Sequence, residues 1–238
     1  SEMCIRDSTK SYPGSGTVWK DLSGKANNGT IYHSPSFSND NAGKFNFDTS
    51  DYVDCGNILS QTAYTKSAWF RPESVTQNII SGYGGSGTGQ HAFWMANTDN
   101  ILRAGHRGAW TTVSHTVPSG DMLNQWWNGA VTWNDSTGWV LYLNGVQVDT
   151  DSSTTDPNGS GVYIGRYGSG NWFDGDIAEV LIYDRAITAA EVLQNYQALK
   201  ERYLSKFFKL LNKINLQFYM GILQSSKAYV FNLQTTSS

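Results

Sequence analysis

Short runs of alternating hydrophobic and polar residues recur from residue 17 to residue 184, and clusters of Gly, Asn, Asp and Ser separate them. This pattern is typical of β-strands joined by turns. Twelve runs predict strands, at residues 44–47, 52–55, 65–71, 78–83, 92–96, 101–104, 111–117, 126–133, 139–143, 146–150, 162–167 and 177–183. Because no helical pattern follows each strand, a parallel strand–helix–strand sheet is excluded. Two packed antiparallel sheets remain.

One hairpin is predicted in detail. Residues 139–143 and 146–148 flank the dipeptide Asn144-Gly145, the preferred pair for a type I′ turn, in which both residues need a positive φ. Alternation places Val140 and Tyr142 on one face of the strand and Leu141 and Leu143 on the other. We expect the core between the sheets to include Trp69, Val131, Trp133, Leu141 and Ile182.

A single helix is predicted near residue 190. Thr188, followed three residues later by Glu191, forms a capping-box pattern. Apolar side chains then recur at helical spacing, at Val192, Tyr196, Leu199 and Tyr203. We expect this helix to cover a sheet edge or one end of the sandwich.

The composition agrees with a sheet-rich globular domain, since 13% of residues are aromatic, 16% are charged and 24 are Gly. The net charge of −3 does not favour nucleic acid as a partner. No apolar run approaches the roughly 18 residues that would indicate a transmembrane helix. Two cysteines, Cys4 and Cys55, are too few for a disulfide framework, and we expect Cys55 to be a buried free thiol.

The two ends differ from the body. Residues 3–8 resemble a translated sequencing adapter, so residues 1–8 are interpreted as an artefactual leader and residues 9–203 as the domain. Residues 204–238 contain four Lys and no acid, whereas residues 1–203 carry 13 basic and 20 acidic residues. This tail is interpreted as non-native or poorly ordered. The alternative is a basic amphipathic helix that lies on a membrane or a partner.

Three stretches of the body resemble the laminin-G-like jelly-roll domains of the concanavalin A-like lectin/glucanase superfamily. They are W-x-D-L-S-G-x-x-N-N-G from Trp19 to Gly29, L-Y-x-N-G from Leu141 to Gly145, and F-D-G-D-I-A-E-V-L-I-Y-D-R-A-I-T-A-A-E from Phe173 to Glu191. The resemblance implies an all-β, antiparallel two-sheet sandwich with one short C-terminal helix.

Relatives begin with a strand ahead of residue 12 that is missing here. We therefore expect the closing strand, 177–183, to lack a partner and to present an exposed edge. Relatives also often hold Ca²⁺, for which Asn171, Asp174 and Asp176 are the candidate ligands. Ala178 stands where relatives often place an Asp, and this weakens the transfer of the calcium site.

The sharpest catalytic candidate is the sequence from Asp174 to Glu179, which resembles the E-x-D-x-x-E motif of retaining glucanases. Its first acid is Asp instead of Glu, and its flanks fit the non-catalytic branch better. The four His stand at no metal-ligand spacing in the sequence. We therefore expect no enzymatic activity.

Two Gly-rich loops carry aromatic residues that can stack on a sugar face, with polar neighbours for its hydroxyl groups. The candidate ligand-binding residues are Arg107, Trp110, Tyr167, Asn171 and Trp172. The sequence thus favours a non-catalytic recognition module for a glycan, in a larger extracellular or virion-surface protein with further domains. The alternatives are a structural or protein-adhesion domain with a protein ligand and, less favoured, a glucanase.

Overall fold

The structure, a computed structural model, describes the backbone of residues 2–5 and residues 10–40, 43–48, 50–75, 77–82, 90–96, 100–117, 122–168 and 170–203. Its largest sheet, the back sheet, has the strand order β15-β14-β13-β7-β17-β5-β4, with β1 also paired to β17. All its pairings are antiparallel. Its strands are β1 (Glu2–Ile5), β4 (Ser36–Ser38), β5 (Lys44–Phe47), β7 (Ala63–Pro72), β13 (Trp127–Asn134), β14 (Gly138–Leu143), β15 (Val146–Asp151) and β17 (Gly175–Tyr183).

Two smaller sheets form the front layer. One has the order β2-β3-β6-β16-β9 and the other β12-β11-β10-β8. Their strands are β2 (Val18–Trp19), β3 (Gly29–Tyr32), β6 (Tyr52–Asn57), β8 (Gln77–Asn78), β9 (Ile80–Ser81), β10 (His91–Met95), β11 (Ile101–His106), β12 (Ala109–Thr116) and β16 (Gly161–Ile164). Ile79 joins the two sheets, because its N–H donates to Phe93 O and its carbonyl accepts from Gly165 N.

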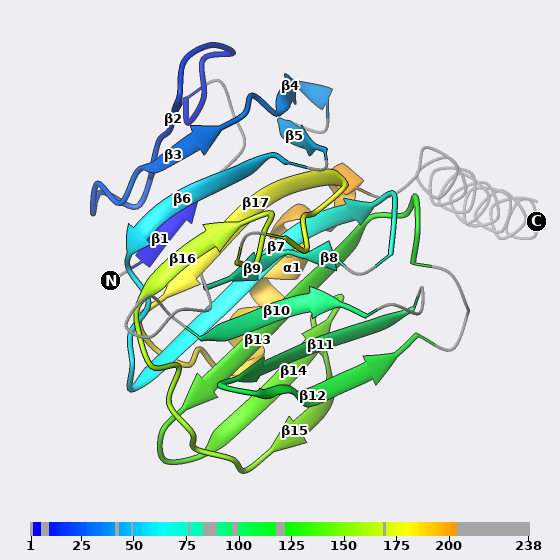
Figure 1. The fold of residues 1–238 in the computed structure, drawn as a ribbon. Coiled ribbons are helices and arrows are strands. Elements are labelled where there is room, and N and C mark those ends of the chain that lie inside the picture. The colour runs from blue at the N-terminus through cyan, green and yellow to red at the C-terminus, as the bar shows by residue number, and fades with distance from the viewer. Residues whose placement is uncertain are drawn as a thin grey trace, which may run out of the picture. The chain divides into compact units, whose positions relative to one another are not determined.

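The hydrophobic core lies between the two layers. In Figure 1, β10, β11 and β12 lie in front of β13 and β14. Val131, Trp133, Leu141 and Ile182 all belong to this core, as predicted. The all-β antiparallel sandwich predicted from the sequence is therefore confirmed, and Cys55 is the predicted buried free thiol.

Trp69 is a correction to the predicted core. It is buried, but its ring stacks on Tyr196 of α1 (Ala189–Tyr203), with 5.6 Å between ring centroids. Tyr64, Ala68 and Phe70 of the same strand belong to the core. Because side chains alternate along β7, Trp69 faces the helix on the opposite side of the back sheet.

The predicted local elements have the expected geometry. Asn144 and Gly145 have φ of 51° and 76°, as a type I′ turn requires. The Thr188 N–H donates to Glu191 Oε2 at 2.8 Å and the Glu191 N–H donates to Thr188 Oγ1 at 3.3 Å, which completes the capping box. The twelve predicted strands correspond to β5–β17, with 78–83 covering β8 and β9. Strands β1 to β4 were not predicted, and each has only two to four residues.

The prediction that the closing strand has an unpaired edge is wrong. Residues Val180–Tyr183 of β17 pair with β1, with Glu2 opposite Tyr183 and Ile5 opposite Val180. The same strand also pairs with β7 and β5. Residues 175–177 and 180–183 of this edge therefore have strand partners. The predicted tail, residues 204–238, lies outside the described residues.

Candidate ligand-binding surface

The outer face of the β3–β6–β16 region carries a cluster of aromatic side chains, which we call the first aromatic group: Tyr32, Tyr52, Tyr163 and Trp172. Along these strands Tyr32, Tyr52 and Tyr163 alternate with buried core residues, so they point away from the core. Tyr32 and Tyr52 stack with 4.6 Å between centroids, and Tyr52 lies 5.7 Å from Tyr163 and 5.9 Å from Trp172.

Arg166 holds this group together. Its guanidinium carbon lies 4.1 Å from the ring centroid of Tyr52, 4.7 Å from that of Tyr163 and 5.2 Å from that of Trp172. Partial burial raises the pKa of Tyr52, and the positive charge of Arg166 acts in the opposite direction. Stacking on the cation restricts the rings, so they form a preorganised apolar surface.

A second aromatic group consists of Trp94 on β10 and Trp110 on β12 of the neighbouring front sheet, together with Tyr167 from the loop after β16. Trp110 and Tyr167 contact edge to face, with 5.3 Å between centroids. Trp94 Nε1 donates to Trp110 O at 3.0 Å, and the Arg103 guanidinium lies 5.5 Å from the Trp94 ring centroid. All three aromatic side chains are half-buried. The Arg166–Tyr167 peptide connects the two groups along the chain.

Gly165 determines the backbone conformation at the start of the loop that contributes Tyr167 and Trp172 to the two aromatic groups. Its φ is +85°, and a Cβ there would lie 2.9 Å from the Phe47 ring. Its carbonyl accepts from Phe173 N at 2.7 Å, which closes the loop that contains Trp172. The predicted residue Asn171 is exposed with φ of +53°, and its carbonyl accepts from Asn78 Nδ2 at 3.2 Å. Only a residue without a side chain fits Gly165 without strain.

Of the five predicted ligand-binding residues, Trp110 and Tyr167 meet directly and Trp172 joins the first aromatic group. Arg107 is exposed at the β11–β12 turn and pairs with Asp156, with 3.3 Å between Nη1 and Oδ2. Sequence reasoning missed Tyr32, Tyr52, Tyr163, Trp94 and Arg166. The sequence pattern that could have identified the three tyrosines is an aromatic residue at an outward-facing position of a strand with alternating polarity.

The predicted calcium ligands have other partners. Asp176 is fully buried, and its Oδ2 accepts from Lys44 Nζ at 2.8 Å and from Arg71 Nε at 2.7 Å, while Oδ1 accepts from Asn46. The backbone carbonyl of Asp174 accepts from Glu73 N. Among the described residues, no three His, Cys, Asp or Glu side chains are grouped closely enough to hold a metal ion. Calcium at this position stays a prediction.

A polar cluster inside the core was also missed. The register of β10 and β11 places His91 opposite His106, and β7 supplies Tyr64 and Lys66. Lys66 Nζ lies 2.6 Å from His91 Nδ1, and the Tyr64 hydroxyl lies 2.6 Å from His106 Nε2. All four side chains are buried. They are therefore shielded from any dissolved substrate.

Each histidine donates its second ring N–H to a backbone carbonyl. His91 Nε2 donates to Gly161 O at 3.0 Å, and His106 Nδ1 donates to Thr155 O at 2.7 Å. Because burial lowers the pKa of both histidines, each imidazole is neutral at pH 7 and its other nitrogen is an acceptor. Burial lowers the pKa of His106 to about 3, and it also lowers the pKa of His91 and Lys66 well below their usual values.

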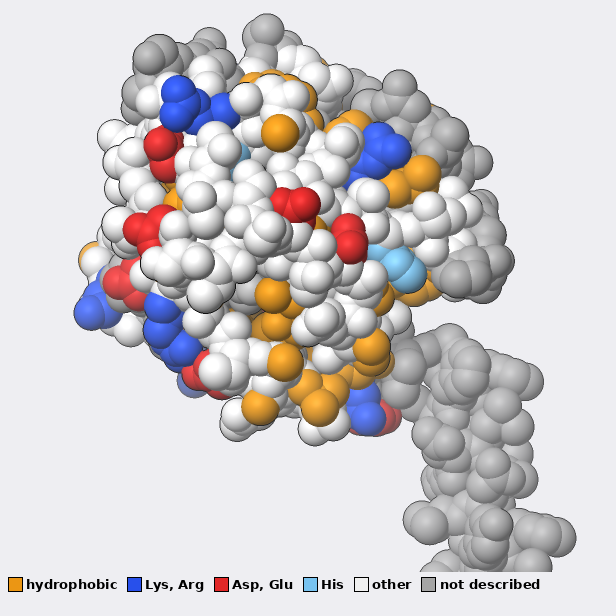
Figure 2. Space-filling view, turned by 90° about the horizontal axis from the view of Figure 1, so that it is seen from below, with side chains coloured by type: hydrophobic (Ala, Val, Ile, Leu, Met, Phe, Trp, Pro, Cys, Tyr) orange, Lys and Arg blue, Asp and Glu red, His pale blue; other side chains and the backbone are white. Residues whose placement is uncertain are grey.

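Charges on the surface are mixed. Figure 2 shows acidic and basic side chains scattered among uncharged ones on the face that it draws, with no broad field of one sign. A continuous basic surface is the usual electrostatic mark of nucleic-acid binding. No helix in the described part of the chain is long and apolar enough to span a membrane.

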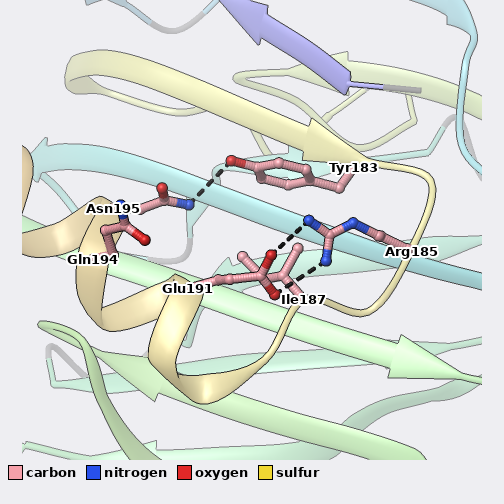
Figure 3. Close-up of a pocket in the computed structure, with 6 residues that line it drawn as sticks. All are labelled: Tyr183, Arg185, Ile187, Glu191, Gln194 and Asn195. Carbon is pink, nitrogen blue, oxygen red and sulfur yellow. Dashed lines mark hydrogen bonds and ion pairs between the residues drawn. The ribbon is translucent and has the colours of Figure 1, made fainter.

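A small pocket lies at the junction of β17 and α1. It measures about 170 Å³ and is lined by Tyr183, Arg185, Ile187, Glu191, Gln194 and Asn195. Figure 3 shows Arg185 paired directly with Glu191 and Asn195 directed at the Tyr183 hydroxyl. Most of the lining is polar, so the pocket suits a small hydrophilic molecule.

Residues 47–193 match the model of the family Laminin_G_3, described as the concanavalin A-like lectin/glucanases superfamily. The predicted resemblance is thereby confirmed. None of the curated protein sequences matches this chain.

Solved structures share the fold at low identity. Domain 4 of AbnA, an extracellular GH43 arabinanase of Geobacillus stearothermophilus, in complex with arabinotriose, is 18% identical with a TM-score of 0.62, over 81% of this chain and 98% of that chain. Trypanosoma rangeli sialidase in complex with sialic acid is 15% identical with a TM-score of 0.63, over 85% of this chain and 33% of that one. The binding domain of botulinum neurotoxin serotype G is 16% identical with a TM-score of 0.55, over 75% and 48% of the two chains.

Proposed function

Because this chain belongs to the Laminin_G_3 family of the concanavalin A-like lectin/glucanases superfamily, we propose that it is a non-catalytic recognition module that binds a glycan on its front face. The observation that carries the proposal is the pair of aromatic groups, with Trp110 against Tyr167 and Trp172 against Arg166. Half-buried rings held in place by neighbours offer flat apolar surfaces for sugar rings at little entropic cost.

The polar groups around these rings match the hydroxyl groups of a sugar. Asn171 is exposed and precedes Trp172 in the chain. Arg103 and Arg107 lie between Trp94 and Trp110 in the sequence. Binding sites for small ligands typically combine apolar walls with a few polar groups that fix orientation. The AbnA domain, which has the same fold, was solved with arabinotriose, and this agrees with a glycan as the ligand class.

The acids of the glucanase-like motif favour a non-catalytic role. A retaining glycosidase needs two carboxyl groups that flank a bound substrate, roughly 5 Å apart. Asp176 is instead buried between Lys44 and Arg71, and Glu179 is also buried. The glucanase alternative makes a different prediction, since hydrolysis of β-glucans abolished by Glu179→Gln would contradict the non-catalytic proposal.

A glycan array probed with the full chain tests the proposal. We expect retention of a limited set of glycans, and we expect Trp110→Ala and Tyr167→Ala each to weaken binding roughly tenfold, because a stacked ring contributes on the order of 1 kcal/mol or more. Val146→Ser is the matched control, since Val146, the first residue of β15, is 62% exposed. If no glycan is retained, the runner-up function, a structural or protein-adhesion domain, replaces this one.

The proposed setting is an extracellular or virion-surface protein with further domains. AbnA is an extracellular enzyme whose domain 4 matches this chain over nearly its whole length. A glycan-binding module of this kind acts by holding its parent protein on a surface or polymer. Recovery of the parent sequence with a secretion signal and neighbouring domains would support this setting, and a cytoplasmic parent would contradict it.

Calcium is a separate proposal, with Asn171, Asp174 and Asp176 as ligands. An ion that binds only the folded state raises the melting temperature. We expect millimolar Ca²⁺ to raise it, EDTA to reverse the rise, and Asp174→Asn to abolish it. An unchanged melting temperature would contradict calcium binding and would leave the glycan proposal intact.

A further inference from the structure

We propose that the pocket between β17 and α1, here called the α1 pocket, binds a single neutral sugar unit. It is separate from the front face, because Figure 1 shows α1 behind the back sheet and away from β10, β11 and β12. The proposal therefore does not depend on glycan binding by the aromatic groups.

The walls of the α1 pocket are held by hydrogen bonds before any ligand arrives. Thr65 Oγ1 donates to Arg185 O at 2.8 Å and accepts from Ile187 N at 3.0 Å, which fixes the turn between β17 and α1 onto β7. Asn195 Nδ2 donates to the Tyr183 hydroxyl at 3.1 Å. A site with fixed walls loses little conformational entropy when it binds.

The charges in the pocket cancel. Arg185 donates to both carboxylate oxygens of Glu191, with distances of 2.6 and 3.0 Å, and Thr188 donates to Glu191 Oε2 through its N–H and its hydroxyl. These hydrogen bonds lower the pKa of Glu191 to about 2, and the bond from Arg185 makes the largest contribution. The carboxylate is therefore ionised and paired at neutral pH, and the site offers no net charge to an ionic ligand.

The remaining polar groups are amides and a phenol. Asn195 uses one amide hydrogen for Tyr183 and retains an acceptor oxygen, and Gln194 lies exposed at the rim with its own donor and acceptor. Such groups pair with hydroxyls that both donate and accept. A volume of about 170 Å³ is below the range of roughly 300–1,000 Å³ for drug-sized ligands, which indicates one ring and not a chain.

Nitrogen-15-detected NMR of the full chain tests the proposal, with methyl glycosides of glucose, galactose, mannose and arabinose as probes. We expect at least one to shift the side-chain amide signals of Asn195 and Gln194 in a saturable way with millimolar affinity, as small ligands with few contacts do. Asn195→Leu and Gln194→Ala should each weaken that binding roughly tenfold by removing a hydrogen bond.

Three outcomes overturn the inference. One is that no probe shifts these signals. A second is that glucuronate binds there more tightly than methyl glucoside, which contradicts a neutral ligand. The third is that Gln194→Ala, an exposed substitution that spares the fold, leaves the affinity unchanged. Shifts confined to the front face would overturn this inference alone and support the proposed function. Tyr167→Ala should leave the shifts at the α1 pocket in place.

Discussion

Lys66 Nζ lies 2.6 Å from His91 Nδ1 in the core between the two layers, and neither side chain is exposed to solvent. Burial lowers the pKa of both groups, and the positive charge of Lys66 lowers that of His91 further. A lysine and a histidine in such contact cannot both be charged. The pair costs the fold least when neither group is charged, because a buried charge without a counter-charge is costly.

We predict that Lys66→Met stabilises the domain at neutral pH. Burial lowers the pKa of Lys66 well below 10.5, so folding is coupled to a cost at this amine that an apolar side chain of similar size does not carry. The loss of the donor to His91 offsets part of this gain. Chemical denaturation of the variant and of the wild type at pH 7 measures the difference, and a Lys66→Met variant that is less stable contradicts the prediction.

The same substitution should change how stability depends on alkaline pH. The pKa of Lys66 is lower in the folded state than the unfolded value of 10.5, so the unfolded chain binds more protons in the window between these values. Stability of the wild type therefore rises as the pH increases towards about 10.5. Lys66→Met should lose this rise, and the advantage of the variant should shrink as the pH approaches 10.

In acid, His106 should destabilise the fold. Its pKa is about 3 in the folded state against 6.5 for an ordinary histidine, because burial is the largest cause. Stability should fall as the pH drops from about 6.5 to 3, since the unfolded chain takes up the proton first. His106→Phe should be less stable at pH 7, because Tyr64 and Thr155 lose their partner, but its decline in acid should be shallower. The exposed His33→Ala variant is the control, measured over the same pH range.

Two glycines separate backbone strain from steric clash. Gly165 and Gly108 have φ of +85° and +88°, but a Cβ at Gly165 would meet Phe47 whereas a Cβ at Gly108 meets no atom within 4 Å. Gly108→Ala should cost about 1–2 kcal/mol of unfolding free energy, because an L-residue is strained at this positive φ. Gly165→Ala should cost at least about 1 kcal/mol more, since overpacking adds roughly 1–3 kcal/mol. If chemical denaturation gives the same loss of unfolding free energy for both variants, the Phe47 ring moves aside without a penalty.

Arg166 should act through the rings that surround it. Arg166→Met removes cation–π contacts with Tyr52, Tyr163 and Trp172, each worth roughly 0.5–2 kcal/mol. We expect lower stability and weaker glycan binding, together with a higher pKa for Tyr52, which loses a favourable positive charge. Arg103→Met, which removes a single such contact with Trp94, is the matched control and should have a smaller effect on stability.

Strand β7 separates what the sequence determined from what it left open. The sequence predicted a strand at residues 65–71, and alternation along that strand places Lys66 and Trp69 on opposite faces. It did not determine which face lies between the sheets, because both faces of this strand are buried. The helix α1 covers one face and buries Trp69, so the other face, with Lys66, meets the front layer.

The sequence also determined the fold class, the Asn144-Gly145 turn and the capping box of α1, since each depends on residues that are neighbours in the chain. The aromatic groups and the Lys66–His91 contact join residues from separate strands, as with Tyr32, Tyr52 and Tyr163. Strand order and register set those contacts. They arise from hydrogen bonding and packing of the whole sandwich, which no local pattern encodes, and only the tertiary structure decided them.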